Sequence, residues 1–549
     1  MRGIAFKLGA IDINILKKAA AVFAAVMLLS AAGCREDDGR DYPFVCNIPS
    51  NPVTLDPQIA DGETADLVIR NIFTGLLALA EDGSVKDGVA ADFVVSDDGL
   101  TYTFKLKQGI YWTDGGDFEE QCTAKDFVYG FTRLFLPETG APRAEDYYCI
   151  KNAQLLHTGK ITDPSLLGVK ANGDFELEIT LEYPDPRFLT KLTETPAMPC
   201  SEKFFLQSQG KYGLSGECTP SNGAFYIRRW LYDPDADQDS NNIILGRHSK
   251  NAETMDVCPS TVTIFIRDKE LYIDDFNGGD ISCLSVSESE RGRIKSECEE
   301  FATVTCGIAF NRRSTLFRNN DFRMALALLV DRDAALTALS GYAPAEGIVP
   351  AEVSMLDKGY RELVGGTQLG CDPDEARRHY LKAEPNIDKS LFTGAKVIVS
   401  DSAAATAVSY AMQEWQREYG FYCVVEQLDG DDYRAALESG DFDIAVLELT
   451  GRYNSPSAYL EQFRAGSADN MTGFANAEFE TLLTQAERTA DLSESAEIYK
   501  RAEEKLIENA AFVPLYCKNE YFFTKEGCTD IVYEPFSGTV DFARAKKFD

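Results

Sequence analysis

Hydrophobic and polar residues alternate along several short segments of the chain. Residues 101–106 (Thr-Tyr-Thr-Phe-Lys-Leu) and 175–182 (Phe-Glu-Leu-Glu-Ile-Thr-Leu-Glu) alternate residue by residue, which predicts strands with one buried face. Residues 396–399 and 442–447 are shorter and more continuously apolar, as expected for strands that are covered on both faces. Helical patterns separate these strands, and this alternation predicts an α/β fold.

Three segments show helical periodicity. Between two of the apolar strands, residues 403–419 place alanine and aromatic residues at helical spacing, and Gly420 supplies a stop signal. Residues 321–338 are rich in alanine and leucine, and residues 372–383 open with an Asp-Pro pair that favours a helix start. We therefore expect one strand–helix–strand unit and two further helices before it.

Size and charge narrow the class of protein. The chain has 549 residues, which exceeds the usual size of one domain, so two or three lobes are expected. Its 88 acidic and 54 basic residues give a formal net charge of −34. Such a charge repels phosphates, so it argues against nucleic acid as a partner and against electrostatic adhesion to anionic lipid.

The N-terminus has the features of an export signal. Residues 1–33 place basic side chains ahead of an apolar run at 19–29, which predicts a cleaved signal peptide rather than a membrane span of roughly 20 apolar residues. Cys34 follows Ala-Ala-Gly, which resembles the bacterial lipoprotein box, although Ala31 stands where leucine is usual.

The lipoprotein resemblance implies lipid attachment at Cys34 and a lipidated tether over residues 34–49. It also implies a location on the outer face of the bacterial cell membrane, which is the periplasmic side in a Gram-negative cell. The alternative is ordinary secretion with Cys34 lost or unmodified.

Cysteine and histidine positions bear on covalent and metal chemistry. When Cys34 is set aside, 13 of the 14 cysteines remain, so at least one would be unpaired in a monomer. Export permits disulfides, and their connectivity stays open. No Cys-x-x-Cys occurs and the three histidines are scattered, so we expect no metal site and no cofactor. The close cysteine pairs are Cys200/Cys218, Cys298/Cys306 and Cys517/Cys528.

A series of short motifs occurs in a fixed order along the chain. In this order, the motifs resemble the oligopeptide/dipeptide family (family 5) of extracytoplasmic solute-binding proteins of ABC transporters, over nearly all of residues 50–540. The motifs are Leu55-Asp56-Pro57, 70–77 (Arg-Asn-Ile-Phe-Thr-Gly-Leu-Leu), Trp112-Thr113-Asp114-Gly115, 123–129 (Thr-Ala-Lys-Asp-Phe-Val-Tyr), Asn222-Gly223-Ala224-Phe225-Tyr226, Val330-Asp331-Arg332 and Gly440-Asp441-Phe442-Asp443.

The family resemblance implies both a fold and a function. The fold is α/β and bilobed, of the periplasmic-binding-protein type (type II, Venus-flytrap), with an extra accessory lobe. The lobes are expected to close over an oligopeptide, whose backbone is held by strand addition. The protein, expected to be a monomer, would then deliver the peptide to the membrane permease of an ABC importer. Discontinuous segments form the implied lobes: lobe one takes 41–73, 200–306 and 515–549, the accessory lobe takes 74–199, and the far lobe takes 307–514.

The most specific site prediction concerns residues 448–456 (Glu-Leu-Thr-Gly-Arg-Tyr-Asn-Ser-Pro). In the family's peptide binders the matching loop resembles Gly-Trp-x-x-Asp-Tyr-x-x-Pro, whose aspartate holds the α-ammonium of the peptide. Tyr453 and Pro456 match this loop, which places Arg452 at the aspartate position and Asn454 beside the tyrosine. An arginine repels an ammonium and suits a carboxylate or a phosphate instead.

Three interpretations of Arg452 stay open. In the first, Glu448 supplies the missing anion, because positions 448, 450 and 452 share one face of an extended strand. In the second, the site takes N-blocked, anionic or non-peptide ligands. In the third, Arg452 is a surface residue that pairs with a neighbouring acid.

Two further regions are candidates for ligand binding. In the loop Asp61-Gly62-Glu63-Thr64, backbone groups near a glycine can approach an extended ligand closely, and the two acids suit an ammonium. The alternative is a solvated acidic loop. Tyr147 lies in the region where the family's accessory lobe offers an aromatic ring to the cleft, and its alternative is a core or interface tyrosine.

Catalysis is the competing class of function. The chain contains no Gly-x-Ser-x-Gly, no His-Glu-x-x-His, no Walker-type phosphate loop and no dinucleotide glycine fingerprint, so we expect no enzyme. A receptor that senses extracellular peptides needs the same closing cleft, so the sequence does not separate sensing from import. Another cargo, such as an anionic or N-blocked ligand, a metal chelate or a sugar, also stays open.

Overall fold

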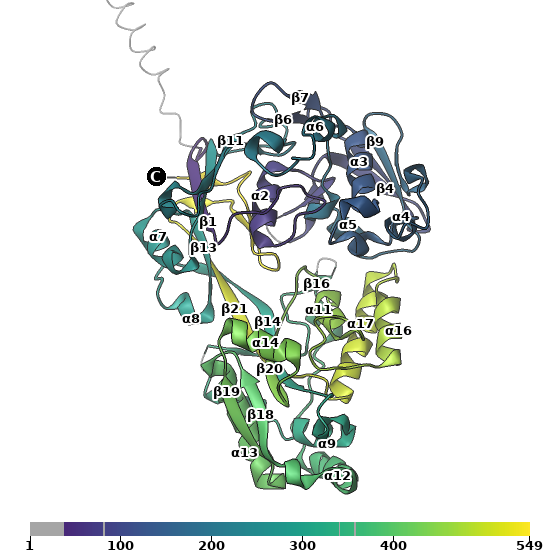
Figure 1. Cartoon of the computed structure of the whole chain (residues 1–549), viewed down its shortest axis with the longest axis vertical. Coiled ribbons are helices and arrows are strands. Elements are labelled where there is room, and N and C mark those ends of the chain that lie inside the picture. Colours follow the sequence, from purple (N-terminus) through teal and green to yellow (C-terminus); the bar gives the residue numbers. More distant parts are fainter. Residues whose placement is uncertain (1–37, 81–82, 340, 356–357, 549) are drawn as a thin grey trace, which may run out of the picture.

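The chain forms two lobes that are stacked along the long axis of the molecule (Figure 1). The predicted signal peptide, Cys34 and the first residues of the tether lie outside the described residues. Within the described part of the chain, no helix is long and apolar enough to cross a membrane. The computed structural model describes residues 38–80, 83–339, 341–355 and 358–548.

We call the part formed by the described residues of 38–297 and 525–548 the upper lobe. It contains a four-stranded sheet in the order β1-β12-β11-β10, in which β1 is parallel to β12 and the other pairs are antiparallel. Burial alternates along β1 and β12, so one face of this sheet enters the core. The strands are β1 (Pro43–Ile48), β10 (Phe225–Leu231), β11 (Asn242–Arg247) and β12 (Thr261–Ile266).

A second antiparallel sheet of the upper lobe has the order β4-β5-β9-β8. Helix α3 (Ala124–Phe135) packs beside it and begins with a capping box between Thr123 and Asp126. Both predicted alternating segments are strands of this sheet. The strands are β4 (Ala90–Val95), β5 (Thr101–Leu106), β8 (Val169–Ala171) and β9 (Glu176–Thr180).

One continuous hydrophobic core joins the two upper sheets. Phe73, which follows α2 (Glu63–Ile72), meets Trp112 edge to face with ring centroids 6.0 Å apart, and both side chains are buried. The segment at 74–199 therefore shares its core with the segments on either side of it in the sequence.

Two long antiparallel strands connect the lobes (Figure 1). β14 (Cys298–Phe310) and β21 (Val513–Thr524) pair along most of their lengths, and we call them the connecting strands. At their upper end β21 also pairs with β13 (Cys283–Ser287), and at their lower end β14 pairs with β20 (Ile444–Thr450). The same two strands are thus built into both lobes, as expected of a hinge.

The lower lobe, formed by the described residues of 311–512, extends this sheet in the order β13-β21-β14-β20-β18-β19. β18 (Thr393–Val399) is parallel to β20 and to β19 (Tyr422–Gln427). Helix α13 (Ser402–Tyr419) connects β18 to β19, and Gly420 ends it with φ of 65°. The predicted strands at 396–399 and 442–447 and the helix between them are confirmed as β18, β20 and α13, but the strand that directly follows the helix is β19, which was not predicted.

Helices cover both faces of the lower sheet and enclose two separate cores. The helix predicted over 321–338 is wrong in its extent, because Asp331 caps a new helix by accepting a hydrogen bond from Ala334 N at 3.0 Å. The helices of the lobe include α9 (Asn320–Ala327), α10 (Arg332–Thr337), α11 (Tyr360–Val364), α12 (Pro373–Ala383), α14 (Gly430–Ser439), α15 (Ser457–Leu460), α16 (Ala477–Ala486) and α17 (Leu492–Glu508).

All 13 cysteines of the described part of the chain are free thiols, and most are buried. Cys298 and Cys306 lie eight residues apart on β14, which separates them by about 26 Å at about 3.3 Å per residue. A disulfide needs α-carbons within about 7 Å, so this suggested pair is wrong. The described residues also contain no group of three or more side chains arranged to hold a metal ion.

Candidate functional site

The lobes touch each other away from the connecting strands through two arginine–tyrosine pairs. The guanidinium of Arg187, from the upper lobe, lies 3.4 Å from the ring centroid of Tyr453, from the lower lobe. Arg488 of the lower lobe lies 4.3 Å from the ring centroid of Tyr183 of the upper lobe. Each lobe therefore supplies one cation and one ring, and we call these contacts the boundary pairs.

The first boundary pair is held by further polar contacts. Arg187 precedes α5 (Phe188–Lys191), and its side chain is 16% exposed and forms an ion pair with Glu194 at 3.5 Å. The hydroxyl of Tyr453 donates a hydrogen bond to Glu461 at 2.7 Å. Burial raises the pKa of the Glu461 carboxyl, while the tyrosine hydroxyl and Arg187 act in the opposite direction. The pair thus lies in a half-buried polar cluster at the boundary.

The loop that follows β20 places Asn454 next to the same boundary. Its side chain accepts a hydrogen bond from Ser354 N and donates one to Ser354 Oγ, each at 2.8 Å. A Cβ built on Gly83 of the upper lobe would lie 3.8 Å from Asn454 Nδ2. Asn454 therefore lies where the two lobes approach, as does Tyr453.

Arg452 lies beyond the end of β20 and points into solvent. Its side chain is 85% exposed, and its guanidinium is 4.0 Å from Asp469, which is itself 51% exposed. An exposed pair at this distance contributes little free energy, so the guanidinium remains accessible to a ligand. The three interpretations of Arg452 stay predictions.

Glu448 lies on β20 and is already paired. It accepts hydrogen bonds from Lys518 Nζ at 2.8 Å and from the hydroxyl of Ser400. Lys518, on the connecting strand β21, also reaches Asp401 at 2.7 Å. One lysine therefore bridges two carboxylates, and a ligand ammonium would compete with Lys518 for Glu448.

The loop at 61–64 leads into helix α2 and is largely exposed. Gly62 has φ of 96°, a conformation that favours glycine, and Glu63 is the first residue of the helix. Gly538 lies close to Glu63, because a Cβ atom added to the glycine would be 3.5 Å from the carboxyl carbon of Glu63. Thr64 Oγ1 lies 3.4 Å from Ser50 Oγ. The two acids of the loop, Asp61 and Glu63, are thus accessible to a ligand.

Tyr147 is fully buried in the core of the upper lobe. Its hydroxyl donates a hydrogen bond to Lys191 O at 2.9 Å, and its ring meets Phe131 edge to face. Both its polar and its apolar groups therefore have partners within the lobe. Its contact with a ligand stays a prediction.

Two half-buried acids that the sequence analysis did not select lie against the connecting strands. Burial raises the pKa of Glu352, which accepts a hydrogen bond from the backbone of Ala302. Burial also raises the pKa of Glu520 on β21, and the charge of Glu63 raises it further, while hydrogen bonds from Ser285 and Tyr533 lower it. Neither acid belongs to a recognisable motif, so no local sequence signal could have identified it.

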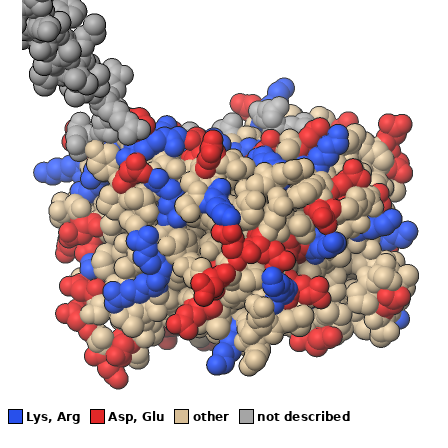
Figure 2. Space-filling view, turned by 90° about the horizontal axis from the view of Figure 1, so that it is seen from above, with Lys and Arg blue, Asp and Glu red and all other residues tan. Residues whose placement is uncertain are grey.

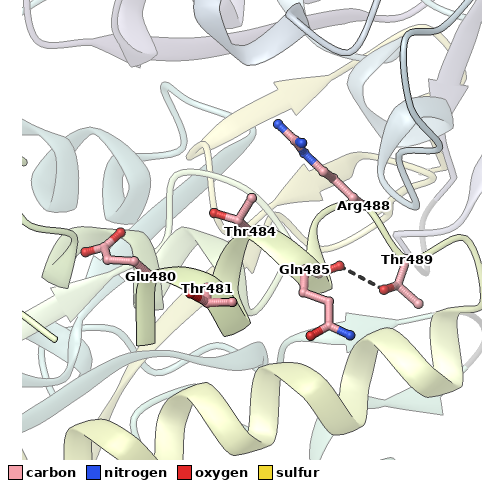
Figure 3. A pocket seen from close by; sticks show the side chains of 6 residues that line it. All are labelled: Glu480, Thr481, Thr484, Gln485, Arg488 and Thr489. Carbon is pink, nitrogen blue, oxygen red and sulfur yellow. Dashed lines mark hydrogen bonds between the residues drawn. The ribbon is translucent and has the colours of Figure 1, made fainter. Parts of the chain in front are cut away.

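A shallow depression of about 590 Å³ runs along α16 and ends at one of the boundary pairs (Figure 3). Figure 3 shows Glu480 near one end, Arg488 near the other, and Thr484 between them. Thr489 Oγ1 donates a hydrogen bond to Gln485 O at 2.8 Å. Since one helix and the residues just after it supply all its lining residues, the depression is an open surface beside the boundary rather than an enclosed site.

Comparisons with known proteins agree with this architecture. A family model described as bacterial extracellular solute-binding proteins, family 5 Middle, matches residues 84–237 and 273–471, more than half of the chain. Oligopeptide-binding protein OppA of Bacillus subtilis (strain 168) is 25% identical over 514 residues, which cover 91% of each chain. The probable deoxycholate-binding periplasmic protein YgiS of Escherichia coli (strain K12) is 27% identical over 496 residues, which cover 86% of this chain and 87% of the relative.

Solved structures share the bilobed fold. The pheromone receptor PrgZ, whose structure is described with its mode of peptide binding, superposes with a TM-score of 0.69 at 23% sequence identity. The superposition covers 93% of this chain and 100% of that chain. At this level of identity, the likeness shows a common fold.

Proposed function

The chain belongs to family 5 of the bacterial extracellular solute-binding proteins, and from this premise we propose that it captures oligopeptides between its lobes and delivers them to the permease of an ABC importer. Proteins of this family bind their cargo and perform no chemistry on it. The observation that carries the proposal is the combination of connecting strands shared by both lobes with direct contacts between the lobes elsewhere.

The proposed mechanism is a hinge equilibrium. Closure of the lobes removes an extended peptide from water and lets backbone groups satisfy its N–H and C=O groups by strand addition. A ligand shifts such an equilibrium only by its differential affinity for the closed state. The boundary pairs supply contacts that depend on how closely the lobes approach, because each pair takes one residue from each lobe.

The division into lobes is part of the proposal. Lobe one comprises 41–73, 200–306 and 515–549, the accessory lobe comprises 74–199, and the far lobe comprises 307–514. We assign ligand contacts to the loop Asp61, Gly62, Glu63 and Thr64 from above, and to Glu448, Arg452 and Asn454 from below. Tyr147 supports the accessory side of the cleft.

Export and lipid attachment at Cys34 complete the proposal. The described chain starts at the same end of the upper lobe as its C-terminal segment, where Lys547 N donates to Gly39 O at 2.9 Å (Figure 1). A tether from this end would hold the protein by its upper lobe at the membrane and leave the lower lobe free to move about the connecting strands.

A second candidate function is the binding of an anionic or N-blocked ligand, including non-peptide cargo. It is favoured by Arg452, which presents an accessible guanidinium where the family's peptide binders carry an aspartate. The name of the relative YgiS refers to deoxycholate, which is an organic anion. Sensing of peptides, as the name of the pheromone receptor PrgZ suggests for that protein, uses the same closing lobes.

Native mass spectrometry of protein produced without residues 1–34 and purified without denaturation tests the proposal. A ladder of co-purified masses that resolve into short peptides on unfolding would support oligopeptide capture. A single non-peptide mass would instead support the second candidate. Protein that is empty and that also ignores a diverse peptide pool would contradict oligopeptide binding.

A further inference from the structure

A cavity of about 460 Å³ lies in the upper lobe between helix α2, the β2–β3 hairpin and the C-terminal segment. The hairpin consists of β2 (Leu77–Leu79) and β3 (Val85–Asp87). No lining residue comes from the lower lobe, and none is among the residues assigned to the ligand cleft. The cavity is therefore a separate site. Its charged lining residues are Arg70, Lys86, Lys107, Arg544, Asp87 and Asp541.

Within the described part of the chain, the cations of this cavity have no ion-pair partner. Among the described residues, no carboxylate lies within 4.0 Å of the charged nitrogens of Arg70, Lys86, Lys107 or Arg544. Four cations and two carboxylates leave the cavity with a formal charge of +2, opposite in sign to the whole chain.

Burial makes this arrangement costly without a counter-ion. Arg70, Lys86 and Lys107 are only partly exposed. Burial lowers the pKa of Lys107, Asp87 raises it, and the charge of Arg544 lowers it. Lys107 Nζ has one hydrogen-bond acceptor, Gly88 O at 2.9 Å, and an ammonium can donate three. An anion in the cavity would supply the missing acceptors and charge.

The remaining walls of the cavity are mostly apolar, and the hydroxyls of Thr74 and Thr254 are their polar side-chain groups. Ala78, Ala80, Met255 and Val532 line it together with the charged groups. The volume exceeds that of a bare inorganic anion and falls in the range of about 300–1,000 Å³ that is usual for small-molecule sites. The lining therefore suits an anion that carries an organic body.

We propose that this cavity is a binding site for a phosphate group attached to a small organic body. A phosphate monoester carries a charge of about −1.5 to −2 near neutral pH, which matches the local charge of +2. Arginine offers a planar fork to phosphate oxygens, and lysine adds point charges from other directions. The site is independent of the proposed peptide cleft.

Such a group reaches an exported protein either as a soluble phosphomonoester or as a lipid headgroup. The start of the described chain lies beside the cavity, because Arg40 pairs with Asp256, the neighbour of the lining residue Met255. A lipid tether would bring this end of the upper lobe close to a membrane. The two sources share one recognition chemistry, and the experiment separates them.

The soluble source is tested by isothermal titration calorimetry with phenyl phosphate at low ionic strength. We expect wild-type binding to weaken about tenfold or more in Arg70→Gln and in Lys107→Gln, because each substitution removes charge-assisted hydrogen bonds to the phosphate. The control Lys382→Gln removes an exposed cation that has no ion pair on helix α12 and should bind as wild type does. Added salt should weaken binding, and benzyl alcohol, a neutral aromatic compound, should not bind.

The lipid source is tested by flotation of the same variants with phosphatidylcholine vesicles that contain or lack phosphatidic acid. The site is assigned to lipid headgroups if the wild-type protein floats only with vesicles that contain phosphatidic acid. This flotation should be lost in Arg70→Gln and Lys107→Gln and kept in Lys382→Gln. Phenyl phosphate binding without vesicle capture assigns it to soluble phosphomonoesters. Absence of both kinds of binding in the wild type, or binding that is equal in all variants, overturns the proposal, whereas loss of peptide binding alone leaves it intact.

Discussion

The guanidinium of Arg187 lies 3.4 Å from the ring centroid of Tyr453, so a cation of the upper lobe rests directly on an aromatic ring of the lower lobe. Glu194 pairs with the arginine from one side, and Glu461 accepts a hydrogen bond from the tyrosine hydroxyl on the other. Each partner is thus also held by an acid of its own lobe. A cation–π contact of this kind contributes about 0.5–2 kcal/mol, depending on desolvation.

Removing this contact should favour the open arrangement of the lobes. We expect Arg187→Leu to shift the open–closed equilibrium about 5- to 30-fold towards open, from the loss of roughly 1–2 kcal/mol, and to weaken ligand binding accordingly. Small-angle X-ray scattering of the unliganded protein should show a larger radius of gyration. The control Arg229→Leu makes the same change on the exposed part of β10, away from the boundary, and should stay near wild type. An unchanged radius and affinity in Arg187→Leu would show that the contact does not couple the lobes.

The sequence predicted those elements whose signals are local. Helix α13 was expected over 403–419 and spans Ser402–Tyr419, because its alanine spacing and Gly420 act within a few residues. The single helix expected over 321–338 was wrong in its extent, because the side chain of Asp331 caps the start of a second helix instead of continuing the first. Arg187 and Tyr453 are far apart in the sequence, and only the approach of the two lobes brings them together. No periodicity or motif could have indicated that contact.

The ion pair between Arg361 and Glu503 should be essential for the stability of the lower lobe. Their side chains are 5% and 0% exposed, with 2.6 Å between Nη2 and Oε1. Glu503 also accepts a hydrogen bond from Val349 N at 3.0 Å. Arg361→Leu would leave a buried carboxylate without its counter-ion, which we expect to lower the free energy of unfolding by about 3–5 kcal/mol in urea denaturation.

The matched control for this prediction is an exposed ion pair. Lys389 and Glu384 have side chains that are 51% and 40% exposed, so Lys389→Met should change stability by less than about 1 kcal/mol. Equal small effects of Lys389→Met and Arg361→Leu would mean that the buried pair contributes no more than a surface pair does.

Asp126 should make the protein less stable as the pH rises towards neutrality. Burial raises the pKa of its carboxyl from 3.8 to about 6 in the folded protein, although hydrogen bonds from Thr123 oppose this shift. Between about pH 4 and pH 6 the folded state therefore binds more protons than the unfolded state, so the stabilising contribution is present below pH 4 and is lost as the pH rises through 6.

The substitution that tests this linkage is Asp126→Asn. The amide oxygen can still accept the hydrogen bond that Thr123 N donates to the carboxylate at 2.7 Å, so the start of α3 is kept. At about 1.36 kcal/mol per pKa unit, the variant should gain up to roughly 3 kcal/mol over wild type at pH 7, and almost nothing at pH 4. Chemical denaturation across this range measures the difference, and a difference that does not change with pH would contradict the raised pKa.

Arg452 should select cargo by charge if it faces the ligand. Its guanidinium is 85% exposed and only 4.0 Å from Asp469, so a charge reversal at this position disturbs no buried partner. We expect Arg452→Asp to strengthen binding of free-amine peptides and to weaken binding of anionic ligands. Each change should be about tenfold, because two opposite charges about 4 Å apart near a protein surface interact by a few kcal/mol before solvent screening.

The control for Arg452→Asp is Arg377→Asp on α12, which makes the same change in net charge on an exposed helix of the lower lobe. It separates a contact with the ligand from a general effect of charge on association. Titration calorimetry with a free-amine peptide and its N-acetylated form measures both directions at once. If Arg452→Asp leaves both affinities as they are in wild type, the residue is a surface cation, and the amine-binding acids must be sought in the loop at 61–64. If Arg377→Asp changes the two affinities in the same directions as Arg452→Asp does, the net charge of the protein controls binding, and a contact at position 452 does not.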